Sequence, residues 1–155
     1  IWYPDPEFDL PIFGADIVAN KKIVTAAITD ISPVDGLDHP IYEDIEAISQ
    51  YYSFKHNREI PTWGTIFSPY SKFARLDDSE EIGKFCDVVN EYLDVFVGAV
   101  WKSTMNYNRA DERYEGQIEY CEKQKKNDKT RKILEKYFGE KWADDYINEV
   151  LFDEP

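Results

Sequence analysis

The chain has 155 residues, 43% of them hydrophobic, and a formal net charge of −13. This length suits a single domain with a real core, and the negative charge argues against non-specific nucleic-acid binding and against an anionic membrane surface as partner. No apolar run reaches the roughly 18 residues of a membrane-spanning helix, and no signal-peptide pattern is present.

Sequence motifs for bound cofactors and metals are absent. The chain has no Gly-x-Gly-x-x-Gly, no Cys-x-x-Cys and no His-Glu-x-x-His, and His39 and His56 both fall in loop-like segments. We therefore expect no bound metal, iron–sulfur centre or Rossmann-type cofactor. Cys86 and Cys121 lack metal-ligand spacing. We expect both to be reduced thiols in a cytoplasmic protein, and a disulfide between them is the other interpretation.

The first element is a β-like run bracketed by Pro11 and Gly14 within 8–18. Successive strand residues point to opposite faces, so Ile12, Asp16 and Val18 share one face and Phe13 the other. A carboxylate held among apolar walls has a raised pKa and can donate a proton. An edge-strand Asp16 that points to solvent or caps a loop is the other interpretation.

Further strands and a helix follow. A turn at 20–22 leads to a second strand over 23–31, rich in β-branched residues, and a loop over 33–40. Apolar spacing predicts a helix over 41–54. Residues 55–64 form an irregular polar segment in which Arg58 either meets an anionic ligand or is solvated, and 70–75 is a third strand.

The remainder of the chain is helical. Asp78 and Glu81 have the spacing of a capping box before a long helix whose stripe includes Phe85, Val97 and Val100. A loop over 103–109 precedes a helix from Arg109 to about Lys126. Asn127 and Asp128 then have the chemistry of a helix N-cap. The following apolar stripe, ended by Gly139, comprises Ile133, Leu134, Tyr137 and Phe138.

A last helix is expected from Glu140 to about Val150, with four side chains facing in: Trp142, Tyr146, Ile147 and Val150.

Basic residues are concentrated around the start of the penultimate helix. They are Lys123, Lys125, Lys126, Lys129, Arg131, Lys132 and Lys136. A solvated helix face explains most such runs. In so acidic a chain, the same run also suits the docking of an acidic protein.

Five segments in order resemble one family. They are 10–18 (LPIFGADIV), 26–33 (AAITDISP), 61–67 (PTWGTIF), 124–131 (QKKNDKTR) and 150–153 (VLFD). Together they resemble the ferredoxin-dependent bilin reductases, over essentially the whole chain. The resemblance implies a three-layer α/β/α sandwich around a central antiparallel sheet, with 1–155 as a single domain lacking roughly its first third.

The resemblance also implies an activity. Such enzymes bind biliverdin IXα between the sheet and the C-terminal helices and carry no metal or organic cofactor. A reduced [2Fe-2S] ferredoxin delivers single electrons while the protein delivers protons, so bilin radicals are intermediates.

Site residues follow by matching positions to the family. Asp16 matches the central proton-donating aspartate. Asn127 and Asp128 match a pair that approaches the bilin from the helical side, and in some members that second aspartate also takes part in proton transfer. The resemblance therefore implies that all three are catalytic. Arg58 and Lys129 match positions that contact the propionates. The pocket-lining positions expected are Thr25, Trp63, Ile133 and Phe13, and the ferredoxin-docking positions are Lys123, Lys125, Lys126, Arg131 and Lys132.

The family pattern is incomplete in this sequence, and two other functions stay open. A histidine and a glutamate that phycocyanobilin-forming members use would lie before Ile1, so the product is either phycocyanobilin or phycoerythrobilin. A bilin carrier or chaperone without turnover would keep Arg58 and Lys129 as anchors. A small α/β module that recruits an acidic partner would have no slot for a tetrapyrrole.

Overall fold

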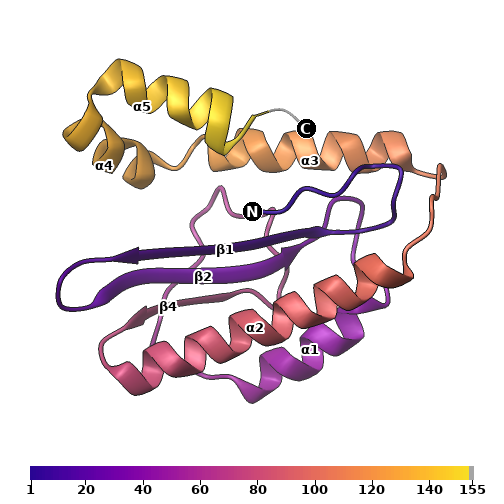
Figure 1. Cartoon of the computed structure of the whole chain (residues 1–155), viewed down its shortest axis with the longest axis horizontal. Coiled ribbons are helices and arrows are strands. Elements are labelled where there is room, and N and C mark those ends of the chain that lie inside the picture. The colour runs from indigo at the N-terminus through magenta and orange to yellow at the C-terminus, as the bar shows by residue number, and fades with distance from the viewer. Residues whose placement is uncertain (154–155) are drawn as a thin grey trace.

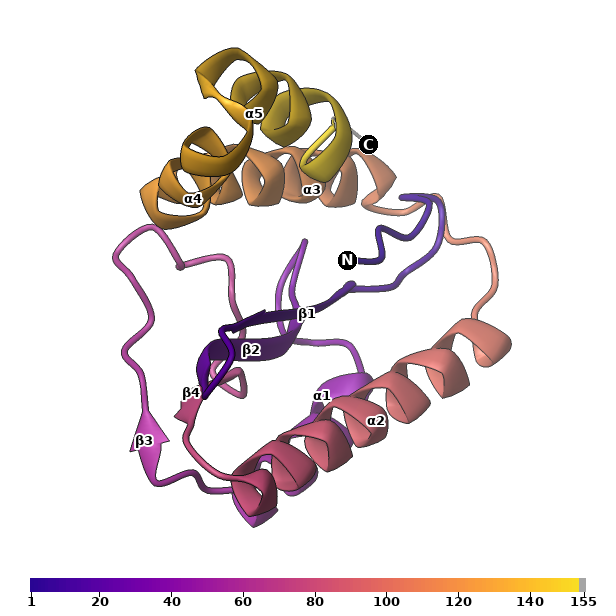
Figure 2. The same cartoon turned by 60° about the vertical axis from the view of Figure 1, so that its left-hand side comes forward.

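The structure, a computed structural model, describes residues 1–153 as an antiparallel sheet between two helical layers. The elements are β1 (Ile12–Ala19), β2 (Val24–Ser32), α1 (Ile41–Tyr51), β3 (His56–Asn57), β4 (Lys72–Leu76), α2 (Ser79–Lys102), α3 (Ala110–Gln124), α4 (Asp128–Phe138), α5 (Glu140–Tyr146) and a π-helical turn (Ile147–Leu151). Helices α1 and α2 cover one face of the sheet, and α3, α4 and α5 lie over the other (Figures 1 and 2). The predicted three-layer α/β/α sandwich is confirmed.

Within residues 1–153 the sheet has four strands in the order β1-β2-β4-β3. The β1–β2 turn is fixed by the Asn20 side chain, whose Oδ1 accepts hydrogen bonds from the backbone N–H of Lys22 (2.8 Å) and Ile23 (3.1 Å). This Asx geometry is a common reason for Asn at a turn. The short β3 pairs with β4 inside the segment that the sequence predicts to be irregular.

The face of the sheet toward α1 and α2 carries the main core. Its buried residues include Ala27, Ile31, Ile41, Ile45, Ala74, Leu76, Phe85, Val88, Tyr92 and Phe96. As predicted, Asp78 caps α2, since its Oδ1 accepts a hydrogen bond from the Glu81 backbone N–H at 2.9 Å. Val97 and Val100 are 40% and 41% exposed, against the prediction. Val97 lies about 100° round the helix from the buried line through Tyr92 and Phe96, and Val100 lies one turn beyond Phe96, the last buried residue of α2.

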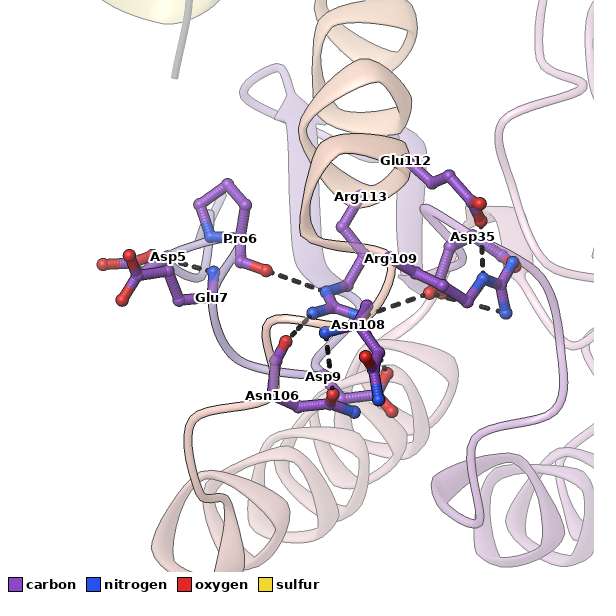
Figure 3. A network of polar contacts seen from close by, with 10 residues as sticks. All are labelled: Asp5, Pro6, Glu7, Asp9, Asp35, Asn106, Asn108, Arg109, Glu112 and Arg113. Atoms are coloured by element: carbon purple, nitrogen blue, oxygen red, sulfur yellow. Dashed lines mark hydrogen bonds and ion pairs between the residues drawn. The ribbon is translucent and has the colours of Figure 1, made fainter.

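Helix α3 is fixed over the other face by the buried Arg113. Its Nε donates to the Pro6 carbonyl at 2.8 Å and its Nη1 to the Asn108 carbonyl at 2.9 Å, and Nη2 donates to Asn106 (Figure 3). Arg113 also lies 3.5 Å from Asp35, in the loop after β2. One guanidinium thus ties the start of α3 to three separate loops, and this orients the helix that roofs the sheet.

The helices α4 and α5 pack mainly on each other. No residue of α4 is buried, and Tyr137 and Phe138 are 71% and 59% exposed. The ring centroids of Phe138 and Trp142 are 4.4 Å apart, and those of Trp142 and Tyr146 are 4.8 Å apart. Trp142 and Val150 are 43% and 66% exposed, so the inward orientation predicted for both is wrong. The Trp142 ring stacks along the helix pair instead. Ile147 is buried as predicted.

The two cysteines have different surroundings, and no helix in the described residues has the form of a membrane span. In the described part of the chain no disulfide joins Cys86, which is exposed, to Cys121, which is buried. Among residues 1–153 no helix is both long and apolar enough to cross a membrane.

Candidate functional site

A cleft of about 580 Å³ opens between the sheet and the layer formed by α3 and α4. Its floor comes from β1 and β2, one wall from the segment 58–67, and its roof from the end of α3 and the start of α4. The lining residues include Gly14, Asp16, Val18, Thr25, Ala26, Ile28, Asp30, Arg58, Trp63, Phe67, Phe73, Tyr120, Gln124, Lys126, Asn127, Asp128, Lys129, Thr130 and Ile133.

Strand register decides which side chains reach this cleft. Gly14 lies opposite Asp30, and Asp16 lies opposite Ile28. Because side chains alternate across a strand, these four residues share the face toward α3. Phe13 lies on the opposite face, where its ring packs against Phe96 with centroids 5.7 Å apart. Phe13 therefore does not line the cleft, and its expected pocket role is corrected.

Asp16 lies on the outer strand and its side chain is accessible through the open cleft. The surrounding protein nevertheless desolvates the carboxylate, and this raises its pKa above the usual range, although a backbone hydrogen bond at Ile17 opposes the shift. Both interpretations drawn from sequence contribute: within residues 1–153 Asp16 is exposed on an edge strand, and it lines the cleft. A raised pKa favours the protonated form, which can donate a proton.

Arg58 supplies positive charge at the wall of the cleft. Its Nη1 donates to the Thr25 carbonyl at 2.6 Å, and its guanidinium carbon lies 5.1 Å from the centre of the Phe73 ring. Within residues 1–153 the bond to Thr25 is the one hydrogen bond that the Arg58 side chain makes. A guanidinium has five N–H donors. Arg58 is thus held in place with donors left for a carboxylate.

The roof carries the three consecutive residues that the sequence singled out. Asn127 precedes α4, but its side chain does not cap the helix; its Nδ2 donates to the Thr130 hydroxyl at 3.0 Å. Asp128 and Lys129 begin α4, and both side chains are exposed along the cleft. The helix N-terminus favours negative charge there, so Lys129 and the helix end together suit an anionic group.

Aromatic rings form the remaining wall. The centroids of Trp63 and Phe67 are 6.0 Å apart, and those of Phe67 and Tyr120 are 6.4 Å apart with the rings nearly perpendicular. Thr25 lines the cleft while its hydroxyl donates to the Val18 carbonyl at 3.0 Å. Such flat, apolar walls suit a conjugated ligand.

Asp30 and Tyr120 are cleft residues that sequence reasoning missed. Asp30 is only 2% exposed, and burial raises its pKa to about 6 even though hydroxyl and amide donors stabilise its charge. One feature of the sequence could have identified Asp30 as a cleft residue. It lies two residues after Ile28, the residue opposite Asp16, and therefore points to the same face of the sheet. No local pattern, however, separates a buried Asp from an exposed one at a strand end.

The expected docking residues differ in their surroundings. Lys123 donates to the Thr65 hydroxyl at 2.7 Å and pairs with Glu119, and Arg131 pairs with Asp144. Lys126 lines the cleft itself, whereas Lys125 and Lys132 lie outside it. No group of three or more His, Cys, Asp or Glu side chains in the described chain could hold a metal ion.

The family model for ferredoxin-dependent bilin reductases matches residues 1–153. The chain belongs to the ferredoxin-dependent bilin reductase family. This membership agrees with the resemblance carried by the five sequence segments.

Two curated bilin reductases are similar over the whole chain. A phycocyanobilin:ferredoxin oxidoreductase of Synechococcus sp. (strain CC9902) is 46% identical and one of Prochlorococcus marinus (strain MIT 9303) is 45% identical, each covering 100% of this chain. The chain covers 64% and 60% of their respective lengths, so it spans about three fifths of the curated relatives that it matches.

A solved plant protein shares the fold. The phytochromobilin synthase of tomato, solved in complex with biliverdin, superposes with a TM-score of 0.81 at 23% identity, over 97% of this chain and 57% of the tomato chain. At this identity the likeness establishes the fold, and the ligand belongs to the tomato structure.

Proposed function

We propose that this protein catalyses the four-electron reduction of biliverdin IXα to a phycobilin, phycocyanobilin or phycoerythrobilin, with ferredoxin as electron donor. The observation that carries the proposal is the single cleft into which β1 brings Asp16 and the start of α4 brings Asn127 and Asp128. Residues 1–155 would form one domain together with further strands of the same sheet.

The chemistry divides between donor and protein. Ferredoxin supplies electrons one at a time, and Asp16 supplies a proton to the singly reduced bilin. Desolvation raises the pKa of Asp16, and this favours the protonated form that the proposed donation needs. Asn127 and Asp128 orient the bilin from the roof, and Asp128 is a second proton donor. Arg58 and Lys129 bind the two propionates.

The proposal is tested by supplying the full-length protein with biliverdin and reduced ferredoxin without oxygen. We expect the bound bilin spectrum to change, and chromatography to give one phycobilin. Its identity decides between phycocyanobilin and phycoerythrobilin. Biliverdin that binds and stays unchanged would contradict the reductase and indicate a carrier, and no binding would contradict both.

Arg58→Gln is expected to weaken biliverdin binding by about 10–100-fold, since a hydrogen bond to a charged group contributes about 1.5–3 kcal/mol. Biliverdin dimethyl ester, which lacks the carboxylates, should bind wild type and Arg58→Gln alike. Absorbance titrations of both ligands measure this. Arg75→Gln on the neighbouring strand β4, which pairs with Asp77, is the matched control. An equal loss of ester affinity would mean that Arg58 acts through the fold instead.

Lys125→Glu with Lys132→Glu is expected to slow ferredoxin-driven turnover by about 10-fold at low salt, and much less above ~0.5 M salt, because the Debye length falls to a few ångströms there. Neither lysine lines the cleft, so biliverdin affinity should not change. Lys21→Glu with Lys22→Glu, in the exposed β1–β2 turn, makes the same change in net charge. Equal effects of the two pairs would exclude docking at α4.

A further inference from the structure

Residues 58–71, between β3 and β4, form the wall segment of the cleft. The segment rises from β3 toward α4 and returns to β4 (Figure 2). Its backbone bends through two tight turns, in which the N–H of Gly64 donates to the Pro61 carbonyl at 2.8 Å and the N–H of Phe67 donates to the Gly64 carbonyl at 3.1 Å. Trp63 and Phe67 line the cleft from these turns. The turns shape the segment, but its distance from the sheet and from the roof depends on contacts with other elements.

Apolar packing attaches the wall segment to the rest of the fold. Ile66 is buried with Ile12 of β1 and Tyr120 of α3, and Trp63 and Phe67 pack against this cluster. Apolar packing is non-directional, so it does not by itself fix the position of the wall. Two sets of directional hydrogen bonds, one to the sheet and one to the roof, supply that restraint.

Asp30 of β2 holds the wall segment to the sheet. Its Oδ2 accepts a hydrogen bond from the Ser68 backbone N–H at 2.8 Å, and its Oδ1 accepts one from the Ser68 hydroxyl at 2.5 Å. The Ser32 hydroxyl also donates to Oδ2, at 2.6 Å. Asp30 and Ser68 are 2% and 3% exposed, so water does not compete for these bonds. Two bonds to one carboxylate fix both the position and the orientation of Ser68, the residue that follows Phe67.

Lys123 of α3 holds the same segment to the roof. Its Nζ donates to the Thr65 hydroxyl oxygen at 2.7 Å, and it pairs with Glu119 one turn earlier on α3. Lys123 does not line the cleft, and its side chain is 24% exposed. Thr65 and Ser68 lie on either side of Phe67 in the sequence, so the two anchors bracket an aromatic residue of the cleft.

We propose that Asp30 and Lys123 are positioning residues, which hold the wall segment at the distance from sheet and roof that a flat ligand needs. This inference rests on the proposed function, in which that ligand is biliverdin. It assigns Lys123 to the shape of the cleft and not to the docking of ferredoxin. Asp30 acts through Ser68, and Lys123 acts through Thr65, so neither has to touch the ligand.

The two anchors should affect binding and not proton transfer. Asp16, the proposed proton donor, lies on β1 and outside the wall segment. A displaced wall removes apolar contact from one side of the bilin and lets its flexible conjugated system adopt more shapes. We therefore expect weaker biliverdin binding and a broader absorption band of the bound bilin, with kcat little changed.

Thr65→Val and Lys123→Met test the contact at the roof. Thr65 is exposed, and valine has nearly the same shape as threonine, so the fold should be kept. Absorbance titration of the full-length variants with biliverdin, without ferredoxin, measures the affinity. Each change should raise Kd by about 3–10-fold, the usual effect of one hydrogen bond. The double variant should bind no worse than the weaker single variant, because both changes remove the same bond.

Lys141→Met is the matched control. Lys141 pairs with Asp145 on α5 as Lys123 pairs with Glu119 on α3, and it does not line the cleft. The substitution makes the same change in net charge and should leave Kd unchanged. A docking role for Lys123 predicts the opposite pattern, with unchanged biliverdin affinity in Lys123→Met and slower ferredoxin-driven turnover at low salt.

Ser68→Ala and Ser32→Ala test the contact at the sheet. Each removes one hydroxyl from Asp30, and both serines are buried, but only Ser68 belongs to the wall segment. Ser68→Ala should raise the biliverdin KM by about 10-fold, change kcat by less than about 3-fold, and broaden the bound spectrum. Ser32→Ala should change KM by less than about 3-fold and keep the wild-type spectrum.

Wild-type affinity in both Thr65→Val and Lys123→Met, or equal effects of Ser32→Ala and Ser68→Ala, would overturn the positioning role while turnover by wild type still supports the reductase. If wild type bound biliverdin without reducing it, the reductase would be wrong and the affinity series would still test the wall. Failure of wild type to bind biliverdin would overturn both.

Discussion

Asp16→Asn is expected to bind biliverdin with an affinity close to that of wild type and to lose turnover by about 10²–10⁴-fold, the usual contribution of a positioned general acid. Asparagine has nearly the same shape as aspartic acid and keeps a carbonyl oxygen, so the cleft should keep its form. It has no acidic proton, so reduction should stall after the first electron with a bilin radical visible by EPR.

The pH dependence gives an independent check on the same group. Asp16 donates in its protonated form, so the step that it serves should slow as pH rises through its raised pKa. This limb of the pH–rate profile should disappear in Asp16→Asn. Asp94→Asn, an exposed change on α2 beyond the other face of the sheet, is the matched control. Full turnover by Asp16→Asn would remove the proton-donor role.

Gly116→Ala is expected to have the largest effect on stability. Gly116 lies on α3, and a Cβ there would lie 2.7 Å from the Val34 carbonyl carbon, 2.9 Å from its Cα, and would overlap its carbonyl oxygen. These are backbone atoms and cannot rotate away, so the helix itself has to move. We expect a loss of about 3 kcal/mol in the free energy of unfolding, at the upper end of typical overpacking costs.

Urea unfolding of the full-length protein measures this loss. Gly83→Ala and Gly98→Ala on α2 are matched controls, since nothing lies within 4 Å of a Cβ at either position. Each should instead stabilise by about 0.5–1 kcal/mol, because alanine is the better helix former. If Gly116→Ala unfolded at the same urea concentration as wild type, the close approach of α3 to Val34 would be wrong. A folded Gly116→Ala with a shifted α3 should bind biliverdin weakly, because α3 carries Tyr120.

The sequence determined the local elements and the family. Alternation along β1 predicts that Asp16 and Phe13 point to opposite faces of the sheet, and in the structure they do. The strand pattern therefore predicted the position of Phe13 correctly, whereas the match to a pocket position of the family did not. The Asp78 cap of α2 was equally local, since the carboxylate and its amide partner are three residues apart. The five segments with their order were sufficient for the family.

Only the tertiary structure decided the content of the site. The environment of Asp30 depends on Ser68, 38 residues away, and no spacing rule brings the two together. The exposed aromatic rings of α4 and α5 show the same limit of prediction from sequence. An apolar stripe indicates which face of a helix is hydrophobic, but not which element that face packs against. Burial depends on how the layers pack together. The pKa of a carboxylate, and the chemistry that it allows, is therefore set only when the helices α3 and α4 cover the sheet.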